Sequence, residues 1–227
     1  MQKVPPKNNN KRKTRNLLQY FLLHAQNIFA VYSKYTTFTS ILLQLYRTKR
    51  KKHYFSAMKQ DNSKEIFPVV DEQGNTISSA TRGECHNGSK LLHPVVHLHL
   101  FDSQGRIYLQ QRPMWKDIQP GKWDTAVGGH VDYGEEIADA LHREVREELG
   151  LTGLQPTFLL RYIFESEREK ELVHVFCATY DGEVHPSDEL DGGRFWSRQE
   201  VDEAIGYGIL TPNFEQEYRR IEPLIRH

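Results

Sequence analysis

The stretch from Gly128 to Leu151 constrains the fold of this chain more than any other part of the sequence. Two adjacent glycines, Gly128 and Gly129, follow a short β-like run, and residues 135–149 have the apolar spacing of an amphipathic helix that ends at Gly150. A strand that leads through a glycine pair into such a helix is typical of proteins that mix helices with a sheet. We therefore predict a mixed α/β domain organised around this helix.

Short β-like runs separated by turns surround the helix and support the same fold class. Glycines stand at both predicted hairpin turns, where a tight reversal needs a positive φ. The expected hairpins join residues 66–71 with 76–80 and residues 95–101 with 106–111. Further strands are expected at 123–127, 157–165, 171–180 and 193–196, and further helices at 198–205 and 212–225.

Three glutamates on the helix are candidate ligands for a metal ion. Glu144, Glu147 and Glu148 stand at positions i, i+3 and i+4, so we expect their carboxylates to leave one face of the helix and to converge on a hard cation. Three like charges this close repel one another unless a cation or an arginine offsets them, and Arg143 is placed to do so. On this fragment alone, a solvated helix surface with ion pairs within the helix is the commoner interpretation.

The residues around the glutamates favour a metal site over a solvated helix surface. Gly129, Glu135, Arg143-Glu144-Val145, Glu147-Glu148 and Gly150-Leu151 follow one another at the spacing of the Nudix motif, and all nine defined positions are filled. The chain resembles the Nudix family over about residues 65–225. This resemblance implies an α/β/α sandwich with a mixed β-sheet, in a domain that we place at residues 61–227.

The resemblance also implies roles for the residues of the motif. Glu144, Glu147, Glu148 and the carbonyl of Gly129 would bind Mg²⁺ or Mn²⁺, while Glu135 and Arg143 would hold the glutamates in place. The expected reaction is hydrolysis of a diphosphate linkage in a nucleoside diphosphate derivative or a related organic pyrophosphate. The catalytic residues would be Glu144, Arg143 and Glu147, with Glu147 as the general base; Glu165, after the motif, is the alternative base.

Three basic residues precede the glycine pair and are candidates for binding the substrate phosphates. They are Arg112, Lys116 and Lys122. Solvated loop charges are an equally good interpretation of these side chains. The identity of the organic group on the diphosphate is not encoded in any motif that we recognise.

A second resemblance supplies an alternative function. The segments LLHPVVHLHLF and LQQRPMWKDIQPGKWDTAVGGHV are similar to the Nudix branch that includes isopentenyl-diphosphate isomerase, which binds a metal through three histidines and two glutamates. The matching residues here are His86, His93, His130, Glu169 and Glu171. The isomerase has a catalytic cysteine immediately before the Gly-His pair, whereas this chain has Gly128, which can neither donate nor accept a proton. Hydrolysis is therefore favoured over isomerisation.

A binding or regulatory module that kept the fold is an alternative of a different class. The presence of Glu144, Glu147 and Glu148 together argues against it, because a protein that only binds its ligand has no need of all three. We therefore expect an enzyme whose partner is a small-molecule diphosphate. Nucleic acid is not expected as a partner, and the sequence leaves a homodimer open.

The N-terminal segment, residues 1–60, differs in composition from the rest of the chain. It holds 13 of the 30 lysines and arginines but neither aspartate nor glutamate, and it lacks glycine. A disordered basic leader, or translated upstream sequence with the start at Met58, is favoured over a targeting peptide or a nucleic-acid-binding arm. Cys85 and Cys177 are too few for a disulfide framework, and no apolar run is long enough for a membrane span, so a cytoplasmic enzyme is expected.

The interpretation of the leader yields a first prediction. Deletion of residues 1–57 is expected to leave the melting temperature and the catalytic activity unchanged, because the predicted fold begins after Met58. Thermal unfolding of the full and shortened chains checks this. A melting temperature that falls by several degrees would show that the segment packs on the domain.

Overall fold

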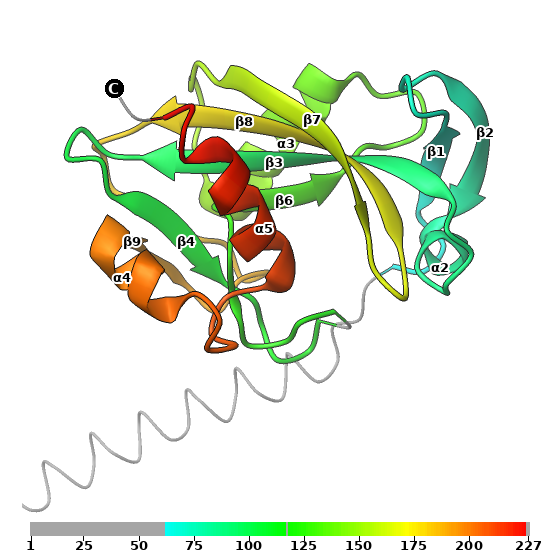
Figure 1. Ribbon diagram of the computed structural model, residues 1–227. Helices are drawn as coiled ribbons and strands as arrows, with labels where there is room; N and C mark the ends of the chain where they lie inside the picture. The colour runs from blue at the N-terminus through cyan, green and yellow to red at the C-terminus, as the bar shows by residue number, and fades with distance from the viewer. Residues whose placement is uncertain (1–61, 117, 226–227) are drawn as a thin grey trace, which may run out of the picture. The chain divides into compact units, whose positions relative to one another are not determined.

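The computed structural model describes residues 62–116 and 118–225, which belong to one compact unit (Figure 1). The predicted leader, residues 1–60, lies outside the described residues. The chain begins with a two-stranded antiparallel hairpin, β1 (Ile66–Val70) and β2 (Thr76–Thr81), followed by the short helix α2 (Arg82–Cys85). Thr81 and Glu84 form a capping box at the start of α2. This one-turn helix lacks apolar periodicity and was not predicted from the sequence.

A mixed sheet of seven strands forms the centre of the domain. Its order is β5-β4-β3-β8-β7, with β6 paired to β3 and β9 paired to β4. The strands are β3 (Leu92–Phe101), β4 (Ile107–Gln111), β5 (Trp123–Asp124), β6 (Val127–His130), β7 (Thr157–Glu165), β8 (Lys170–Thr179) and β9 (Gly193–Trp196). The ten-residue pairing of β3 with β8 is parallel and the other named pairings are antiparallel.

Helices cover both faces of this sheet, as Figure 1 shows. Helix α3 (Ile137–Leu149) packs on one face, and α4 (Arg198–Ala204) and α5 (Pro212–Ile221) lie on the other. Alternate residues of β3 serve the two layers: Val96, Leu98 and Leu100 belong to the core under α3, while Val95 belongs to the core under α5. The predicted α/β/α arrangement is confirmed.

The main difference from the sequence prediction concerns the glycine pair. We expected the strand to end at about residue 127 and to lead through the glycines into the helix, whereas Gly128 and Gly129 are strand residues of β6. They pair with His97 and Val96 of β3. Glycine has low strand propensity, so its place in a strand interior marks close approach of another group rather than a turn.

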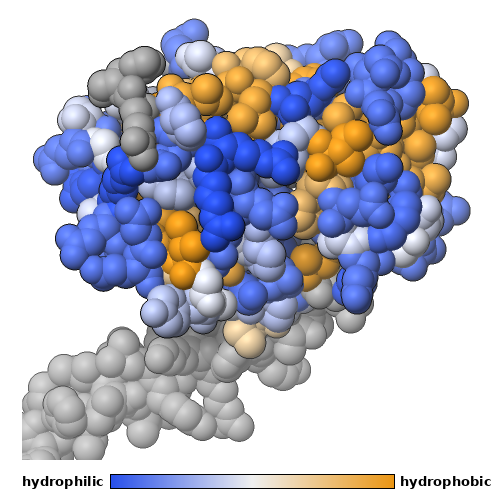
Figure 2. Space-filling model, viewed as in Figure 1, coloured by the Kyte–Doolittle hydropathy of each residue, from blue (hydrophilic) through white to orange (hydrophobic). Residues whose placement is uncertain are grey.

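The surface has the mixed character of a domain in contact with water. Figure 2 shows separate apolar patches interrupted by hydrophilic side chains. Large exposed apolar side chains include Ile77 and Tyr207, which are 66% and 79% exposed. Among the described helices, none combines the length and the apolar character needed to cross a bilayer.

Candidate active site

Helix α3 and strand β6 approach so closely that only glycine fits between them. A Cβ atom on Gly129 would lie 2.1 Å from Cδ of Glu144, well inside van der Waals contact. The Glu144 carboxylate therefore lies directly against the backbone of β6, and its side chain is only 15% exposed. Burial raises the pKa of Glu144 above its ordinary value, although Arg143 opposes this rise.

Arg143 braces the acidic groups at this contact. Its Nε and Nη2 donate to the two oxygens of Glu135 at 2.9 and 2.8 Å, and its Nη1 donates to Glu144 at 2.7 Å. Nη2 also donates to the carbonyl oxygen of His130 at 2.9 Å. This arginine thus ties the start of α3, its middle and the end of β6 together. Its hydrogen bonds to Glu135 hold the pKa of that carboxyl below its usual value.

Glu147 and Glu148 point to different surroundings. The Glu147 side chain is 49% exposed, with its carboxylate 3.4 Å from Nη1 of Arg143. Glu148 is buried and accepts hydrogen bonds from the Gly128 amide and from Nε2 of Gln110, both at 3.3 Å. The three predicted ligands therefore converge only in part, since Glu144 and Glu148 turn inward and Glu147 lies at the exposed edge. Gln110 carried no motif that would have identified it.

Burial has a large effect on the charge of Glu148. Burial first, and then the neighbouring charge of Glu144, raises the pKa of Glu148 to about 8. Lys116, the Gly128 amide and Arg112 oppose this rise. Two buried carboxylates one helical turn apart are the kind of site that a divalent cation stabilises, because it removes both the desolvation cost and the repulsion.

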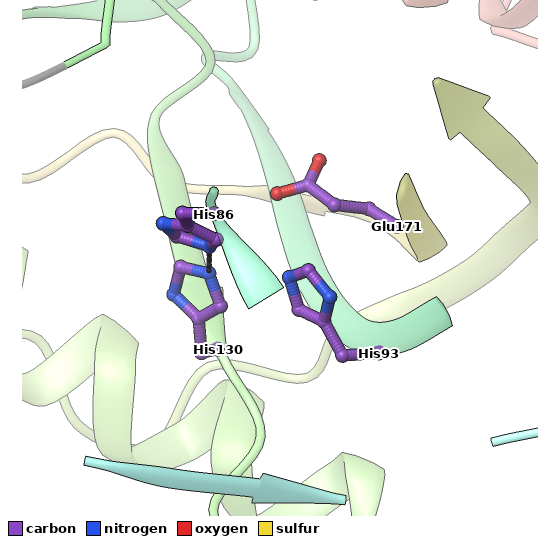
Figure 3. Close-up of side chains that lie close together, drawn as sticks. All are labelled: His86, His93, His130 and Glu171. Atoms are coloured by element: carbon purple, nitrogen blue, oxygen red, sulfur yellow. Dashed lines mark hydrogen bonds between the residues drawn. The ribbon is translucent and has the colours of Figure 1, made fainter. Parts of the chain in front are cut away.

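A second cluster contains all five residues that the isomerase resemblance singled out. His86 follows α2, His93 is on β3, His130 ends β6 and Glu171 is on β8, and one potential ligand atom from each lies within 4.8 Å of the others (Figure 3). Glu169 adjoins this group, with a carboxylate oxygen 3.7 Å from Nε2 of His86. Histidine nitrogens combined with carboxylate oxygens suit a divalent transition metal or zinc.

The hydrogen bonds of His93 fit a metal-binding role. Its Nδ1 lies 2.9 Å from the carbonyl oxygen of Leu91, so this nitrogen carries the proton and donates it. The other nitrogen, Nε2, is buried and has no hydrogen-bond partner within the described residues. Burying a nitrogen lone pair without a hydrogen-bond donor lowers stability, because the lone pair loses its contact with water. A cation bound at the cluster would accept this lone pair.

His130 is less ready to bind a cation in this arrangement. Nη1 of Arg82 lies 3.2 Å from its Nδ1, and arginine can only donate, so Nδ1 must accept. When the ring is neutral its Nε2 then carries the proton, 3.1 Å from Nε2 of His86. For Nε2 of His130 to bind a cation, the ring proton must move to Nδ1, and Arg82 must move away from that nitrogen. Burial, followed by the charge of Arg82, lowers the pKa of His130 and favours the neutral ring.

The two glutamates of the second cluster are also difficult to ionise. Burial, and then the charge of Glu169, raises the pKa of Glu171 to about 8. Burial likewise raises the pKa of Glu169, with Arg112 as the strongest opposing charge. A cation held by His93 and Glu171 would reverse this penalty.

Two of the three predicted phosphate ligands connect the acidic helix with the histidine cluster. Lys116 lowers the pKa of both His130 and Glu148, and Arg112 lowers that of Glu148 and Glu171, so both charges lie near both groups. Arg112 also braces its loop by donating twice to the Ile118 carbonyl, at 3.1 and 3.0 Å. Lys122 contacts the same loop through its main chain, where its carbonyl oxygen accepts a hydrogen bond from the Arg112 amide at 2.9 Å.

Comparisons with known proteins agree with this architecture. The family model described as the NUDIX domain matches residues 91–219. A crystal structure of a Deinococcus radiodurans protein aligns with a TM-score of 0.60 at 22% identity, covering 69% of this chain and 98% of that one. The MutT protein of Methanosarcina mazei aligns with a TM-score of 0.52 at 24% identity, covering 60% of this chain and 96% of the other. These two likenesses concern the fold.

Two sequence relatives carry different names. An isopentenyl-diphosphate Delta-isomerase of Mycolicibacterium vanbaalenii is 36% identical over 145 residues, which is 61% of this chain and 80% of the relative. A Nudix hydrolase of Yersinia pestis, described as uncharacterized, is 30% identical over 170 residues, which is 70% of this chain and 93% of the relative.

The fold and the acidic helix define an α/β/α enzyme of the kind that carries the Nudix motif. The chain belongs to the Nudix family. The predicted family and fold are thereby confirmed, and the assignment as a Nudix hydrolase is confirmed at the level of the family.

The raised pKa of Glu148 predicts how stability depends on pH. The folded protein keeps a proton on Glu148 up to about pH 8, whereas the unfolded chain releases it near 4.5, so this group lowers stability progressively as the pH rises between those values. In the presence of a chelator, Glu148→Gln is expected to raise the free energy of unfolding at pH 8.5 by roughly 1–3 kcal/mol relative to the original chain, and by much less at pH 5.5.

Urea unfolding at both pH values measures this difference. Glu147→Gln is the matched control, because that side chain is half exposed to water and its removal relieves little burial. An equal effect of Glu148→Gln at both pH values would contradict the prediction.

Proposed function

We propose that the chain is a Mg²⁺- or Mn²⁺-dependent hydrolase that cleaves a diphosphate linkage in a nucleoside diphosphate derivative or a related organic pyrophosphate. The observation that carries this proposal is a pair of carboxylates on one turn of α3 beside Gly129, the buried Glu148 and the largely buried Glu144. Their raised pKa values indicate that ionising both carboxyls is costly, a cost that a bound cation would remove. The Nudix motif supplies these residues together with their brace, Arg143.

The residues of α3 have separate tasks in this mechanism. Glu144, Glu148 and the Gly129 carbonyl would hold the cation, with Glu147 at the exposed edge. When bound, a divalent cation supplies positive charge that offsets the phosphate oxygens and makes water a better nucleophile. Arg143 fixes Glu144 through a 2.7 Å hydrogen bond, so that this carboxylate cannot swing away from β6.

Glu147 is the proposed general base. Its half-exposed carboxylate is open to a water molecule, and it adjoins the two buried glutamates on the same helix. The alternative base, Glu165, lies 3.8 Å from both Lys90 and Lys170 at the β7–β8 hairpin. Both oxygens of Glu165 are thus engaged in ion pairs, whereas half of the Glu147 side chain is open to water, which favours Glu147.

Arg112 and Lys116 would bind the diphosphate. Their charges act on both the acidic helix and the histidine cluster, so an anion between the two groups would meet both cations. The small-molecule diphosphate is the proposed partner, and Lys122 remains a proposed ligand through its place on the same loop.

The assembled histidine cluster favours a second candidate function, isomerisation of isopentenyl diphosphate to its dimethylallyl isomer. All five residues expected from the isomerase resemblance lie together, and one relative bears the name of that enzyme. Position 128, where the resemblance places a cysteine, is glycine. Neither Cys85, on α2, nor Cys177, on β8 beside His99, occupies the place of the absent thiol. Hydrolysis therefore remains the first proposal.

Hydrolysis is tested with the full 227-residue chain. In Mg²⁺, a panel of nucleotide sugars, dinucleotides, nucleoside diphosphates and coenzyme A is expected to include at least one compound that releases phosphate or a mononucleotide. Glu147→Gln is expected to lower kcat by about 10²- to 10⁴-fold, because it removes the proton acceptor. Asp139→Asn, an exposed carboxylate in the first turn of the same helix, is the control and keeps the activity.

One combination of results in this assay would contradict the hydrolase proposal. A panel without any turnover, combined with conversion of isopentenyl diphosphate into its dimethylallyl isomer, would replace hydrolysis by the second candidate.

The histidine cluster should hold a metal more tightly than the acidic helix does. Nitrogen ligands favour zinc and transition metals, whereas an all-oxygen site exchanges Mg²⁺ readily. Elemental analysis of the dialysed protein is expected to find a retained transition metal or zinc that His93→Gln removes and Glu147→Gln leaves in place. Retention of the same metal by His93→Gln would refute its assignment to this cluster.

A further inference from the structure

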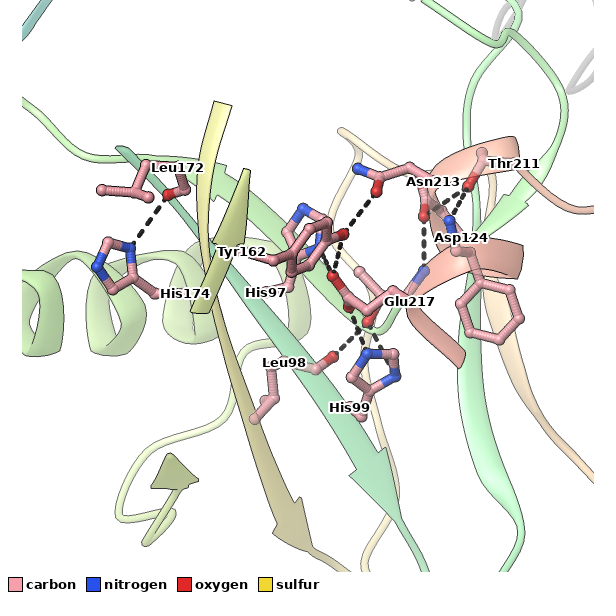
Figure 4. Close-up of polar contacts among 12 residues, drawn as sticks. His97, Leu98, His99, Asp124, Tyr162, Leu172, His174, Thr211, Asn213 and Glu217 are labelled. Carbon is pink, nitrogen blue, oxygen red and sulfur yellow. Dashed lines mark hydrogen bonds and ion pairs between the residues drawn. The ribbon is translucent and has the colours of Figure 1, made fainter. Parts of the chain in front are cut away.

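Glu217 of α5 is a fully buried carboxylate whose charge is compensated from three sides. It accepts hydrogen bonds from Nδ1 of His97 at 2.9 Å, from Nε2 of His99 at 2.5 Å and from the Tyr162 hydroxyl at 2.7 Å (Figure 4). Burial opposes ionisation, but the charge and hydrogen bond of His97, and then those of His99, lower the pKa of Glu217 well below its usual value. This is a carboxylate built to stay charged inside the protein.

The two histidines that hold Glu217 differ in what their other ring nitrogen can do. His99 is completely buried, and its Nδ1 lies 3.4 Å from the Thr125 hydroxyl. The side chain of His97 is 10% exposed to solvent. Its Nε2 has no hydrogen-bond partner in the described part of the chain. His99 is therefore enclosed by the protein, whereas Nε2 of His97 is open to a further contact.

Gly128 defines the space in front of that edge. Gly128 pairs with His97 across the β3–β6 ladder, and a Cβ atom at position 128 would lie 3.7 Å from both Nε2 and Cδ2 of His97. A side chain at this position would be in van der Waals contact with the imidazole and would cover it. The absence of a side chain keeps Nε2 accessible.

This edge of His97 lies within the candidate active site. His93 and His97 occupy the same face of β3, and the Gly128 amide beside His97 donates to Glu148 of the acidic helix. The charge of Glu171, a member of the histidine cluster, also acts on His97. His97 therefore lies on the face of β3 that carries His93, and it pairs with Gly128, whose backbone contacts the acidic helix.

We propose that His97, oriented by Glu217, donates its Nε2 hydrogen to an anionic oxygen of the substrate, and that Gly128 provides the opening for this contact. The inference deepens the proposed function, on which it rests, by adding a substrate-binding residue to which neither resemblance assigns a role. It also explains why position 128 is glycine: a side chain there would cover Nε2 of His97.

The charge state of His97 suits a phosphate oxygen. Burial alone would lower the pKa of His97, but the charge and hydrogen bond of Glu217, followed by the charges of Asp124 and Glu171, raise it to about 9. The ring therefore keeps both protons at neutral pH, so Nε2 is a charged donor rather than an acceptor. A hydrogen bond from a charged donor is stronger than one from a neutral group.

The contact is tested first by binding, which does not require turnover. Methylenediphosphonate, a diphosphate that resists hydrolysis, is added with Mg²⁺ to the ¹⁵N-labelled full chain, and the imidazole nitrogens are followed by NMR. His97 Nε2 is expected to shift while the nitrogens of His99 stay in place. Absence of binding, or binding without a change at His97, would overturn the proposal.

Variants test the same contact by calorimetry with the same probe. His97→Gln and Gly128→Ala are each expected to weaken binding roughly 10- to 100-fold, the first by removing the charged donor and the second by covering it. Gly128→Ala is expected to fold, since its Cβ would meet His97 and Thr125 only at ordinary contact distances of 3.7–3.9 Å. His174→Gln is the matched control, because His174 binds the Leu172 carbonyl, as Figure 4 shows.

The outcomes separate this inference from the proposed function. If the probe depends on His97 but no diphosphate in the panel is hydrolysed, the contact stands and the hydrolase proposal fails. If hydrolysis proceeds and both variants bind the probe and turn over substrate as the original chain does, the contact is wrong while the hydrolase proposal stands.

Discussion

Burial of acidic side chains is the constraint on which the rest of this structure depends. Glu148, Glu169 and Glu171 are buried and Glu144 is largely buried, and burial raises the pKa of each. Desolvation and mutual repulsion make such a group of carboxylates costly unless positive charge compensates it. The positive charges of Arg143, Arg112 and Lys116 compensate this group only in part. Divalent ions would supply the remaining positive charge.

Glu217 shows what the same fold does with a carboxylate that is fully compensated. Three donors surround it, and the pKa of Glu217 is lowered rather than raised. The contrast separates two functions of buried acid: Glu217 orients neighbouring rings, while Glu148 and Glu171 retain unsatisfied affinity for a cation. Both kinds of group border β6, because its two glycines allow the acidic helix to approach on one face and His97 on the other.

Much of the acidic site could be predicted from local sequence, because its residues lie on one helix and the strand before it. Helical geometry fixes the relation of Arg143 to Glu144 and Glu147, and the motif spacing indicated that Glu135 would support them. The exposure of Glu147 and the burial of Glu148 could not be read in this way. They depend on how far α3 is rotated against the sheet, which is set by packing around Val145 and Leu149.

The sequence by itself determined the family, the α/β class, the acidic helix and, through resemblance, the five residues of the histidine cluster. Only the tertiary structure decided that Gly128 and Gly129 belong to a strand, that Arg82 lies against Nδ1 of His130, and that Glu217 lies against His97. Glu217 is separated from His97 by 120 positions, and neither residue carries a local pattern that points to the other. Their contact arises because α5 packs across β3, and such a long-range arrangement is fixed by the burial of whole helix and sheet faces rather than by spacing along the chain.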